Sequence, residues 1–282
     1  MSDSSFTATL LDDHCVSGDT VASHCTTIDI ESDLLGRLAG VKIVVTDVPA
    51  GLADLVPLAR TLESRSSADA INQASSAGDN VPCGKGCGAC CSYLIPLSAP
   101  EALRMGREIG PLSESSDPAT ARTLTAAAGR ILQGWPESPF AQTDPDDDGE
   151  ACDIEAVGRW YASLDLPCPF LGQGAECRIY DKRPLACREH AVLGSAAHCD
   201  GFSSERGNRL ETPLNVLDAL GQLTADLEQT EVQAVMMPLV PFWYEENHHR
   251  ALQSWPGPEL VSRFLDCLAD TAAQTTGVSE AA

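Results

Sequence analysis

A block of four cysteines within nine residues constrains this chain more than any other feature. It runs from Cys83 to Cys91 as CGKGCGACC, with three glycines between the thiols. Thiolates that share a metal must converge on it at metal–sulfur distances of about 2.3 Å, and glycine provides the backbone angles that such a tight wrap needs. The block therefore predicts an irregular loop that presents Cys83, Cys87, Cys90 and Cys91 to a metal centre.

The two adjacent thiols at the end of this block are hard to direct at one metal. On a helix the side chains of Cys90 and Cys91 diverge by about 100°, and on a strand they point to opposite faces. They share a metal only where the backbone is irregular. A simpler interpretation sends one thiol to the main centre and the other to a second site or to the core.

A second group of thiols follows much later in the chain. It comprises Cys168, Cys177, Cys187 and Cys199. A four-coordinate metal ion or an iron–sulfur cluster takes about four thiolates, so the two groups together offer enough ligands for one cluster and a second site.

Basic residues surround the second group, although the chain as a whole is acidic. Between Arg178 and Arg188 there are four basic residues and one acidic residue. A thiolate-ligated cluster carries net negative charge, and flanking arginines lower the cost of burying it. Arg178 and Arg188 are therefore the candidates for contact with the cofactor. They suit an anionic substrate or a carboxylate of a partner equally well.

Two alternatives need no metal. Free cysteine is among the most buried residue types, but glycine flanks the first block where a core segment would carry leucine or valine. A disulfide framework is expected in exported proteins, and residues Met1 to Ser5 lack the basic start and apolar run of an export signal. We expect a cytoplasmic protein, in which clustered thiols bind metal or do redox work.

The motifs and their order along the chain resemble those of the YkgJ-like cysteine-cluster family, whose signature is CxxCxxCC. The resemblance covers roughly residues 80–200 and rests on the block at 83–91, CPFL at 168–171, CRIY at 177–180 and RPLACR at 183–188. The spacing from Cys83 to Cys87 is one residue longer here than in that signature. The resemblance implies zinc or iron binding, with Cys168, Cys177 and Cys187 as partner ligands and Cys199 as a weaker candidate.

The resemblance implies no particular reaction. We expect an iron–sulfur cluster that serves electron transfer or a redox reaction, because the Cys-Pro pair at 168–169 is similar to ferredoxin-type cluster loops. One alternative is a non-catalytic interaction module stabilised by zinc. Another is a metal-dependent group-transfer enzyme, since flagellin lysine methylases carry this kind of cluster. No catalytic residue is identified, and no glycine-rich nucleotide loop is present in the sequence.

The charge of the chain limits its partners. There are 41 acidic and 18 basic residues, which gives a formal net charge of −23. Such a surface repels phosphate backbones and anionic lipids, so nucleic acid and membrane surfaces are poor partners. The longest apolar stretch, Ala234 to Tyr244, is too short to span a bilayer. The expected partner is a protein or redox partner of unknown identity.

An acidic stretch fits the spacing of a calcium loop. Acidic residues at Asp144, Asp146 and Asp148 precede Gly149, and Glu155 stands at the twelfth position. A solvated acidic linker is the preferred interpretation, because Pro136 and Pro139 interrupt the helix that should enter the loop.

Hydrophobic periodicity predicts a mainly α fold with a small N-terminal β hairpin and cysteine-rich irregular loops around a metal centre. Strands are expected near Ile28 and Ile43, and a capping box at Ser98 and Glu101 begins a helix. Cys267 lies on a helical face and is expected to pack in the core. Four segments are expected: a flexible polar tail at 1–25, the hairpin and a helix at 26–80, the cysteine-cluster domain at 81–200, and a helical segment at 201–282 packed on it.

Overall fold

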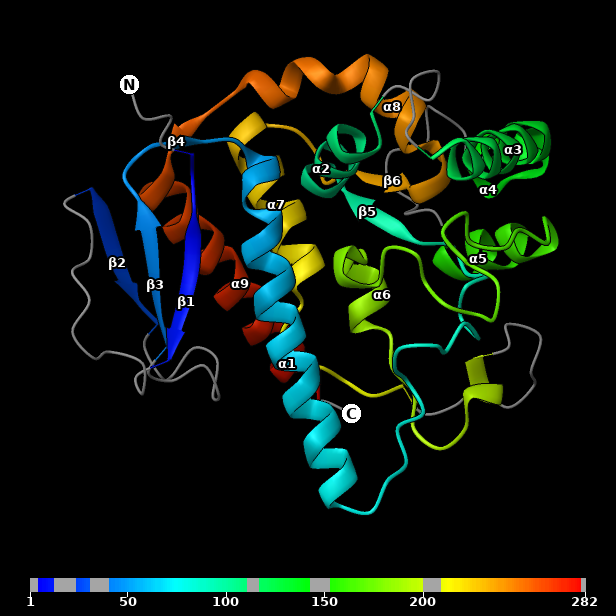
Figure 1. Cartoon of the computed structure of the whole chain (residues 1–282), viewed down its shortest axis with the longest axis horizontal. Helices are drawn as coiled ribbons and strands as arrows, with labels where there is room; N and C mark the ends of the chain where they lie inside the picture. Colours follow the sequence, from blue (N-terminus) through cyan, green and yellow to red (C-terminus); the bar gives the residue numbers. More distant parts are fainter. Residues whose placement is uncertain are drawn as a thin grey trace.

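The computed structural model describes residues 5–12, 24–30, 41–110, 117–142, 153–199 and 209–279. Helices dominate these segments, a small sheet lies near the N-terminus, and most of the cysteines lie in loops (Figure 1). The predicted fold class is therefore confirmed. Across the described part of the chain, no helix combines the length and the apolar character that crossing a membrane requires.

The α-helices differ widely in length. They are α1 (Val56–Ser76), α2 (Ala99–Ile109), α3 (Pro118–Gly134), α4 (Pro139–Gln142), α5 (Ile154–Ser163), α6 (Leu185–Glu189), α7 (Val216–Glu228), α8 (Val240–Asn247) and α9 (Gly257–Ser279). Short 3-10 helices join them: η2 (Leu52–Asp54), η4 (Trp135–Glu137), η5 (Tyr180–Lys182), η6 (Ala196–Cys199), η7 (Met237–Leu239) and η8 (His248–Leu252).

The main sheet has the strand order β1-β3-β2, with β1 (Ala8–Asp12) and β2 (Cys25–Asp29) both antiparallel to β3 (Val41–Thr46). The predicted strands near Ile28 and Ile43 therefore pair with each other. Strand β1 lies within residues 1–25, where a flexible tail is expected, and Ala8 and Leu10 of this strand pack against the core. Polar neighbours concealed this short edge strand in the sequence.

One large core, which we call the main core, joins the two ends of the chain. Ile43 of β3, Leu58 of α1, Leu220 of α7 and Phe264 of α9 are all almost fully buried in it. Figure 1 shows α1, α7 and α9 gathered beside the sheet. The segments predicted at 26–80 and 201–282 thus bury one apolar surface together, while the division of the chain into domains stays a prediction.

Two smaller sheets connect distant segments. The strands β4 (Pro49–Ala50) and β7 (Trp255–Pro256) pair at the entrance to α9, and β5 (Pro96–Ser98) pairs with β6 (Ala234–Met236). Leu97 of β5 and Val235 of β6 are buried in a second core that also contains Phe170. Because β5 follows the first cysteine block directly, this pairing anchors one end of that block.

Local sequence signals set the helix starts. Ser98 and Glu101 form the predicted capping box of α2, and proline stands in the first turn of α1 and of α2. The helix expected within residues 26–80 corresponds to α1. These elements support the loops that carry the cysteines.

Candidate metal centre

The first cysteine block folds as a chain of tight turns. The N–H of Cys87 donates to the carbonyl of Gly84 at 3.1 Å, and the N–H of Cys91 donates to the carbonyl of Gly88 at 3.0 Å. Gly86 has a φ of 93°, which favours glycine. A Cβ at Gly88 would meet Ala175 and Leu171 at 3.1 Å, so glycine here lets the two cysteine loops pack together.

The second loop closes on itself between Cys168 and Cys177. Leu171 forms an isolated antiparallel bridge with Cys177, and the N–H of Gly172 donates to the carbonyl of Glu176 at 2.7 Å. The N–H of Cys168 donates to the carbonyl of Cys91 at 2.6 Å. The backbone therefore joins the two blocks directly.

Helix α6 carries Cys187 and begins on a buried carboxylate. The Oε1 atom of Glu101 accepts the N–H of Leu185, the first residue of α6, at 2.8 Å. Its Oε2 atom accepts the N–H and hydroxyl of Ser98 at 3.3 and 3.2 Å. Burial raises the pKa of Glu101, which is 0% exposed. One side chain thus caps α2 and α6 together and fixes the position of Cys187.

Thiols from both blocks come together beside these contacts. The thiols of Cys91 and Cys168 form a hydrogen bond that, with burial, raises the pKa of Cys91 to about 11. A hydrogen bond with Cys91, together with burial, raises the pKa of Cys90 far above its usual range. Burial and then the thiols of Cys90, Cys91 and Cys177 raise the pKa of Cys187 in the same way. The predicted convergence of the two blocks is therefore present in the fold.

The remaining candidates lie around the segment that follows α6. The N–H of Val192 donates to the sulfur of Cys83 at 3.4 Å, and the sulfur of Cys199 lies 3.9 Å from Nε2 of His190. Burial and then the thiols of Cys90, Cys83 and Cys87 raise the pKa of Cys199 to about 11. Cys199, the weaker candidate in the sequence, is thus the most buried of the eight cysteines, at 3% exposure.

The thiols stand near one another without forming a closed ion site. Among the residues that the structure describes, no three His, Cys, Asp or Glu side chains are arranged to hold one metal ion as they stand. The eight predicted ligands share one neighbourhood, and their assignment as ligands remains a prediction. Cys25 lies apart in β2, and Cys267 packs against the main core as predicted.

Arg183 is the charged residue that the sequence prediction missed. Its guanidinium lowers the pKa of the thiols of Cys83, Cys90 and Cys187, although burial and neighbouring thiols outweigh it. It lies over the ring of Tyr180 at 3.8 Å from the centroid, and its Nε donates to the Tyr180 carbonyl at 3.2 Å. The RPLACR motif contained this signal, because Arg183 stands in it together with Cys187.

The two predicted cofactor contacts, Arg178 and Arg188, both have partners within the protein. Arg188 donates to the Ser64 hydroxyl at 2.6 Å and to the carbonyls of Asp181 and Arg183 at 2.7 and 3.0 Å. These bonds tie α6 to α1 and to the preceding turn. A cofactor contact for Arg188 stays a prediction, and its observed contacts are structural.

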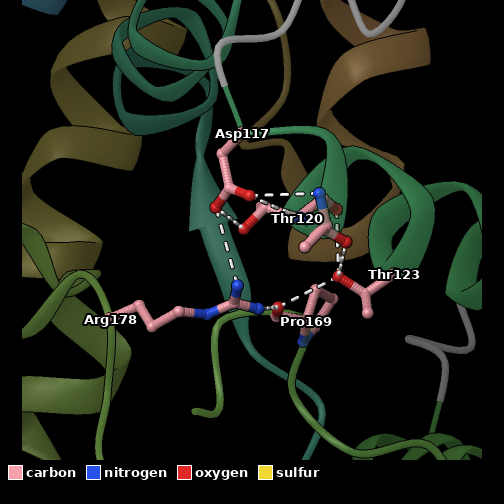
Figure 2. Close-up of polar contacts among 6 residues, drawn as sticks. Asp117, Thr120, Thr123, Pro169 and Arg178 are labelled. Carbon is pink, nitrogen blue, oxygen red and sulfur yellow. Dashed lines mark hydrogen bonds and ion pairs between the residues drawn. The ribbon is translucent and has the colours of Figure 1, made fainter.

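Figure 2 shows how Arg178 braces the second loop against α3. Its Nη2 donates to the carbonyl of Pro169 at 2.8 Å, and its Nη1 lies 3.5 Å from the Asp117 carboxylate. Asp117 caps α3 by accepting the N–H groups of Ala119 and Thr120 at 3.1 and 3.2 Å. The Thr123 hydroxyl also donates to the Pro169 carbonyl, at 3.1 Å. Because Pro169 and Arg178 adjoin Cys168 and Cys177, this brace holds both ends of the loop.

A cavity of about 250 Å³ adjoins the thiols. Its wall includes Cys90, Cys187, Tyr93, His190 and Arg209. The rings of Tyr93 and His190 meet edge to face, with centroids 5.6 Å apart. Cys90 and Cys187 therefore adjoin a space beside the thiol cluster.

The predicted calcium loop falls mostly outside the described residues. Asp144, Asp146 and Asp148 all lie in the segment 143–152, whereas Glu155 lies in the first turn of α5 and pairs with Arg159 at 3.4 Å. The acidic linker stays the preferred interpretation there, with calcium binding as the untested alternative.

Comparisons with known proteins support the cysteine motifs. No curated protein and no solved structure matched the chain. Residues 82–201 matched one family model, described as "CxxCxxCC: Putative zinc- or iron-chelating domain". The matched segment contains all eight cysteines of the two blocks, from Cys83 to Cys199. The predicted resemblance is thereby confirmed, and this segment of the chain matches the CxxCxxCC family of zinc- or iron-chelating domains.

Proposed function

We propose that this metal-binding protein holds an iron–sulfur cluster through Cys91, Cys168, Cys177 and Cys187 and serves electron transfer or a redox reaction. The observation that carries the proposal is the contact between the two blocks at Cys91 and Cys168, through both backbone and thiols. Cys187 and Cys177 belong to the same group, since their thiols act on each other electrostatically. Four thiolates are the usual ligand set of such a cluster.

The surroundings suit a negatively charged centre. The guanidinium of Arg183 acts on the thiols of Cys90 and Cys187 and would offset part of the charge of thiolates around a cluster. The brace formed by Arg178, Pro169 and Asp117 holds the Cys168–Cys177 loop in place against α3. An iron–sulfur cluster would supply the electron carrier, and these residues would position and shield it.

Exposure of the ligands favours electron exchange with a partner. Cys91, Cys168, Cys177 and Cys187 are each partly buried, so a cluster among them would lie near the surface. The chain has a formal net charge of −23, which favours a partner whose docking surface is basic. A basic redox protein is therefore the partner class that we propose.

Two other functions use the same thiols. A zinc-stabilised interaction module needs the same four sulfur ligands and would form a colourless protein. A group-transfer enzyme needs space for a substrate beside the metal, and the cavity of about 250 Å³ next to Cys90 and Cys187 offers it. Small-ligand binding at the metal would favour the enzyme over the electron carrier.

Anaerobic purification followed by analysis of iron, zinc and acid-labile sulfide tests the proposal. We expect iron and sulfide in equal amounts and visible absorption that bleaches on reduction. Cys91→Ser and Cys177→Ser should each remove most of the iron, whereas Cys267→Ser, at a site packed against the main core, should retain it. A folded, monodisperse protein with no metal would contradict metal binding, and zinc without iron would replace the cluster by the zinc module.

A further inference from the structure

We propose that the protein has a second metal site, in which Cys83, Cys87, Cys199 and His190 bind one zinc ion beside the cluster. This inference extends the proposed function and rests on it, because it assigns three of the four thiols that the cluster leaves unused; Cys90 stays unassigned. It adds a histidine to the ligands. Zinc is the chemical class of ion that this set of three sulfurs and one nitrogen selects.

The number of thiols is the first argument. The two blocks supply eight cysteines, all within the segment that matches the metal-chelating family. One iron–sulfur cluster or one tetrahedral ion uses about four thiolates. Four of the eight thiols are therefore in excess of what a single centre requires, although they lie close to it.

The electrostatic effects of the thiols on one another's pKa values divide them into two groups. Cys91 interacts with Cys168 and Cys177, and Cys187 interacts with Cys177. Cys199 interacts instead with Cys83 and Cys87. Cys90 interacts with members of both groups and lies between them. The fold thus separates one set of thiols around the Cys168–Cys177 loop from another around the segment after α6.

His190 is placed to complete the second set. It follows the last residue of α6, and its backbone is extended, with φ −88° and ψ 102°. The chain then runs to Val192, whose N–H donates to the sulfur of Cys83 at 3.4 Å. Nε2 of His190 lies 3.9 Å from the sulfur of Cys199, and the Tyr93 ring packs against the imidazole. Cys187, within α6, therefore belongs to the group around the Cys168–Cys177 loop, and His190, directly after α6, lies beside Cys199 in the other group.

The distance between the Cys199 sulfur and Nε2 of His190 is close to the distance between two ligands of one zinc ion. With Zn–S of about 2.3 Å and Zn–N of about 2.05 Å, a tetrahedral site places a sulfur and a nitrogen ligand about 3.6 Å apart. The observed distance between Cys199 and His190 is 3.9 Å. A shift of a few tenths of an ångström would bring these two ligands to a common ion, and the proposal requires Cys83 and Cys87 to turn toward the same ion.

The test measures zinc and iron separately in the full chain, purified without oxygen. We expect about one zinc per chain in addition to the cluster iron. His190→Ala and Cys199→Ser should each lower zinc at least tenfold after dialysis against a zinc buffer and leave iron unchanged. Cys267→Ser is the matched control and should retain both metals. His190→Cys should restore zinc, since it supplies a fourth sulfur.

Zinc X-ray absorption on the unaltered protein gives a readout that no substitution can disturb. Three sulfurs and one imidazole nitrogen around zinc would support the site, and four sulfurs would overturn it. Zinc that persists in both His190→Ala and Cys199→Ser would also overturn it, as would equal loss of iron and zinc from both. Iron without zinc in the unaltered protein would support the proposed cluster and overturn the second metal site. Zinc that depends on His190 in a protein without iron would support the zinc site and contradict the proposed cluster.

Discussion

The N–H of Cys168 donates to the carbonyl oxygen of Cys91 at 2.6 Å, which fastens the second cysteine block to the first through the main chain. The geometry that brings the thiols together therefore depends partly on backbone bonds that need no metal. The main core contains neither residue, and Cys168 packs against the second core.

Removal of metal should consequently loosen the cysteine loops and leave the helices in place. The main core, with Leu58, Leu220 and Phe264 almost fully buried, does not depend on the thiols. We expect chelation to lower the thermal midpoint, because a ligand bound only by the folded state stabilises it. Far-UV circular dichroism at 25 °C should change little. Complete loss of the helical signal would show that metal binding and folding are coupled throughout.

The brace at Arg178 should slow the release of metal. Arg178→Gln removes the ion pair with Asp117 and weakens the bond to the Pro169 carbonyl, which lie 3.5 and 2.8 Å from the guanidinium. Loss of about 1 kcal/mol corresponds to roughly fivefold faster metal transfer to a chelator. Lys182→Gln is the control, because Lys182 is 62% exposed and makes only a 3.7 Å ion pair with Glu108. Equal rates for both variants would assign Arg178 no part in retention.

Gly106 should not tolerate a side chain. A Cβ there would lie 2.3 Å from Cγ of Tyr244, at the contact between α2 and α8. Gly106→Ala should lower the free energy of unfolding by about 1–3 kcal/mol through overpacking. Gly129→Ala in α3 is the matched control, since no atom lies within 4 Å of its added Cβ. That control should gain about 0.5–1 kcal/mol from helix propensity, as measured by urea unfolding.

Glu63 should make stability fall as the pH rises. Its pKa is raised from 4.5 to about 8, mainly by burial and in part by Glu189, against the lowering effects of the Ser67 hydrogen bond and of Arg188. Between these values the folded chain holds a proton that the unfolded chain has lost, so each step upward in pH favours unfolding. Glu63→Gln removes this dependence and retains the acceptor for Ser67.

Unfolding free energies at pH 5 and pH 8 test this effect. Wild type should lose roughly 2–4 kcal/mol more than Glu63→Gln over this interval. The unfolding free energy of Glu63→Gln should still fall somewhat as the pH rises, since burial also raises the pKa of Glu189 to about 7. Glu246→Gln, an exposed position on α8, is the control and should behave as wild type does. Parallel pH curves for wild type and Glu63→Gln would refute the prediction.

Features that depend on neighbouring residues were predictable from the sequence. The capping box of Ser98 and Glu101 and the core position of Cys267 follow from spacing along one helix. The thiol clusters were also visible, because their chemistry is concentrated in short motifs. That the two cysteine blocks lie together in the fold could be expected only from the family resemblance and from the number of ligands that a metal centre requires.

Features that depend on contacts between distant segments were not predictable. Nothing near Glu101 in the sequence indicates that its second oxygen caps α6 at Leu185. The proximity of His190 to Cys199 arises from an irregular segment with no periodic pattern. Arg178 and Arg183 occur in one basic stretch, and only the path of the loop decides which of them acts on the thiols.

The pairing of β5 with β6 has a consequence for any attempt to isolate the chelating unit. The matched segment ends at residue 201, yet Leu97 within it is buried beside Val235 beyond it. A fragment cut at the limits of the match would expose that leucine and leave β5, which follows the first cysteine block, with an unpaired edge. The segment that matches the family is therefore shorter than the segment that keeps its packing intact. A fragment of this protein should be designed to include both β5 and β6.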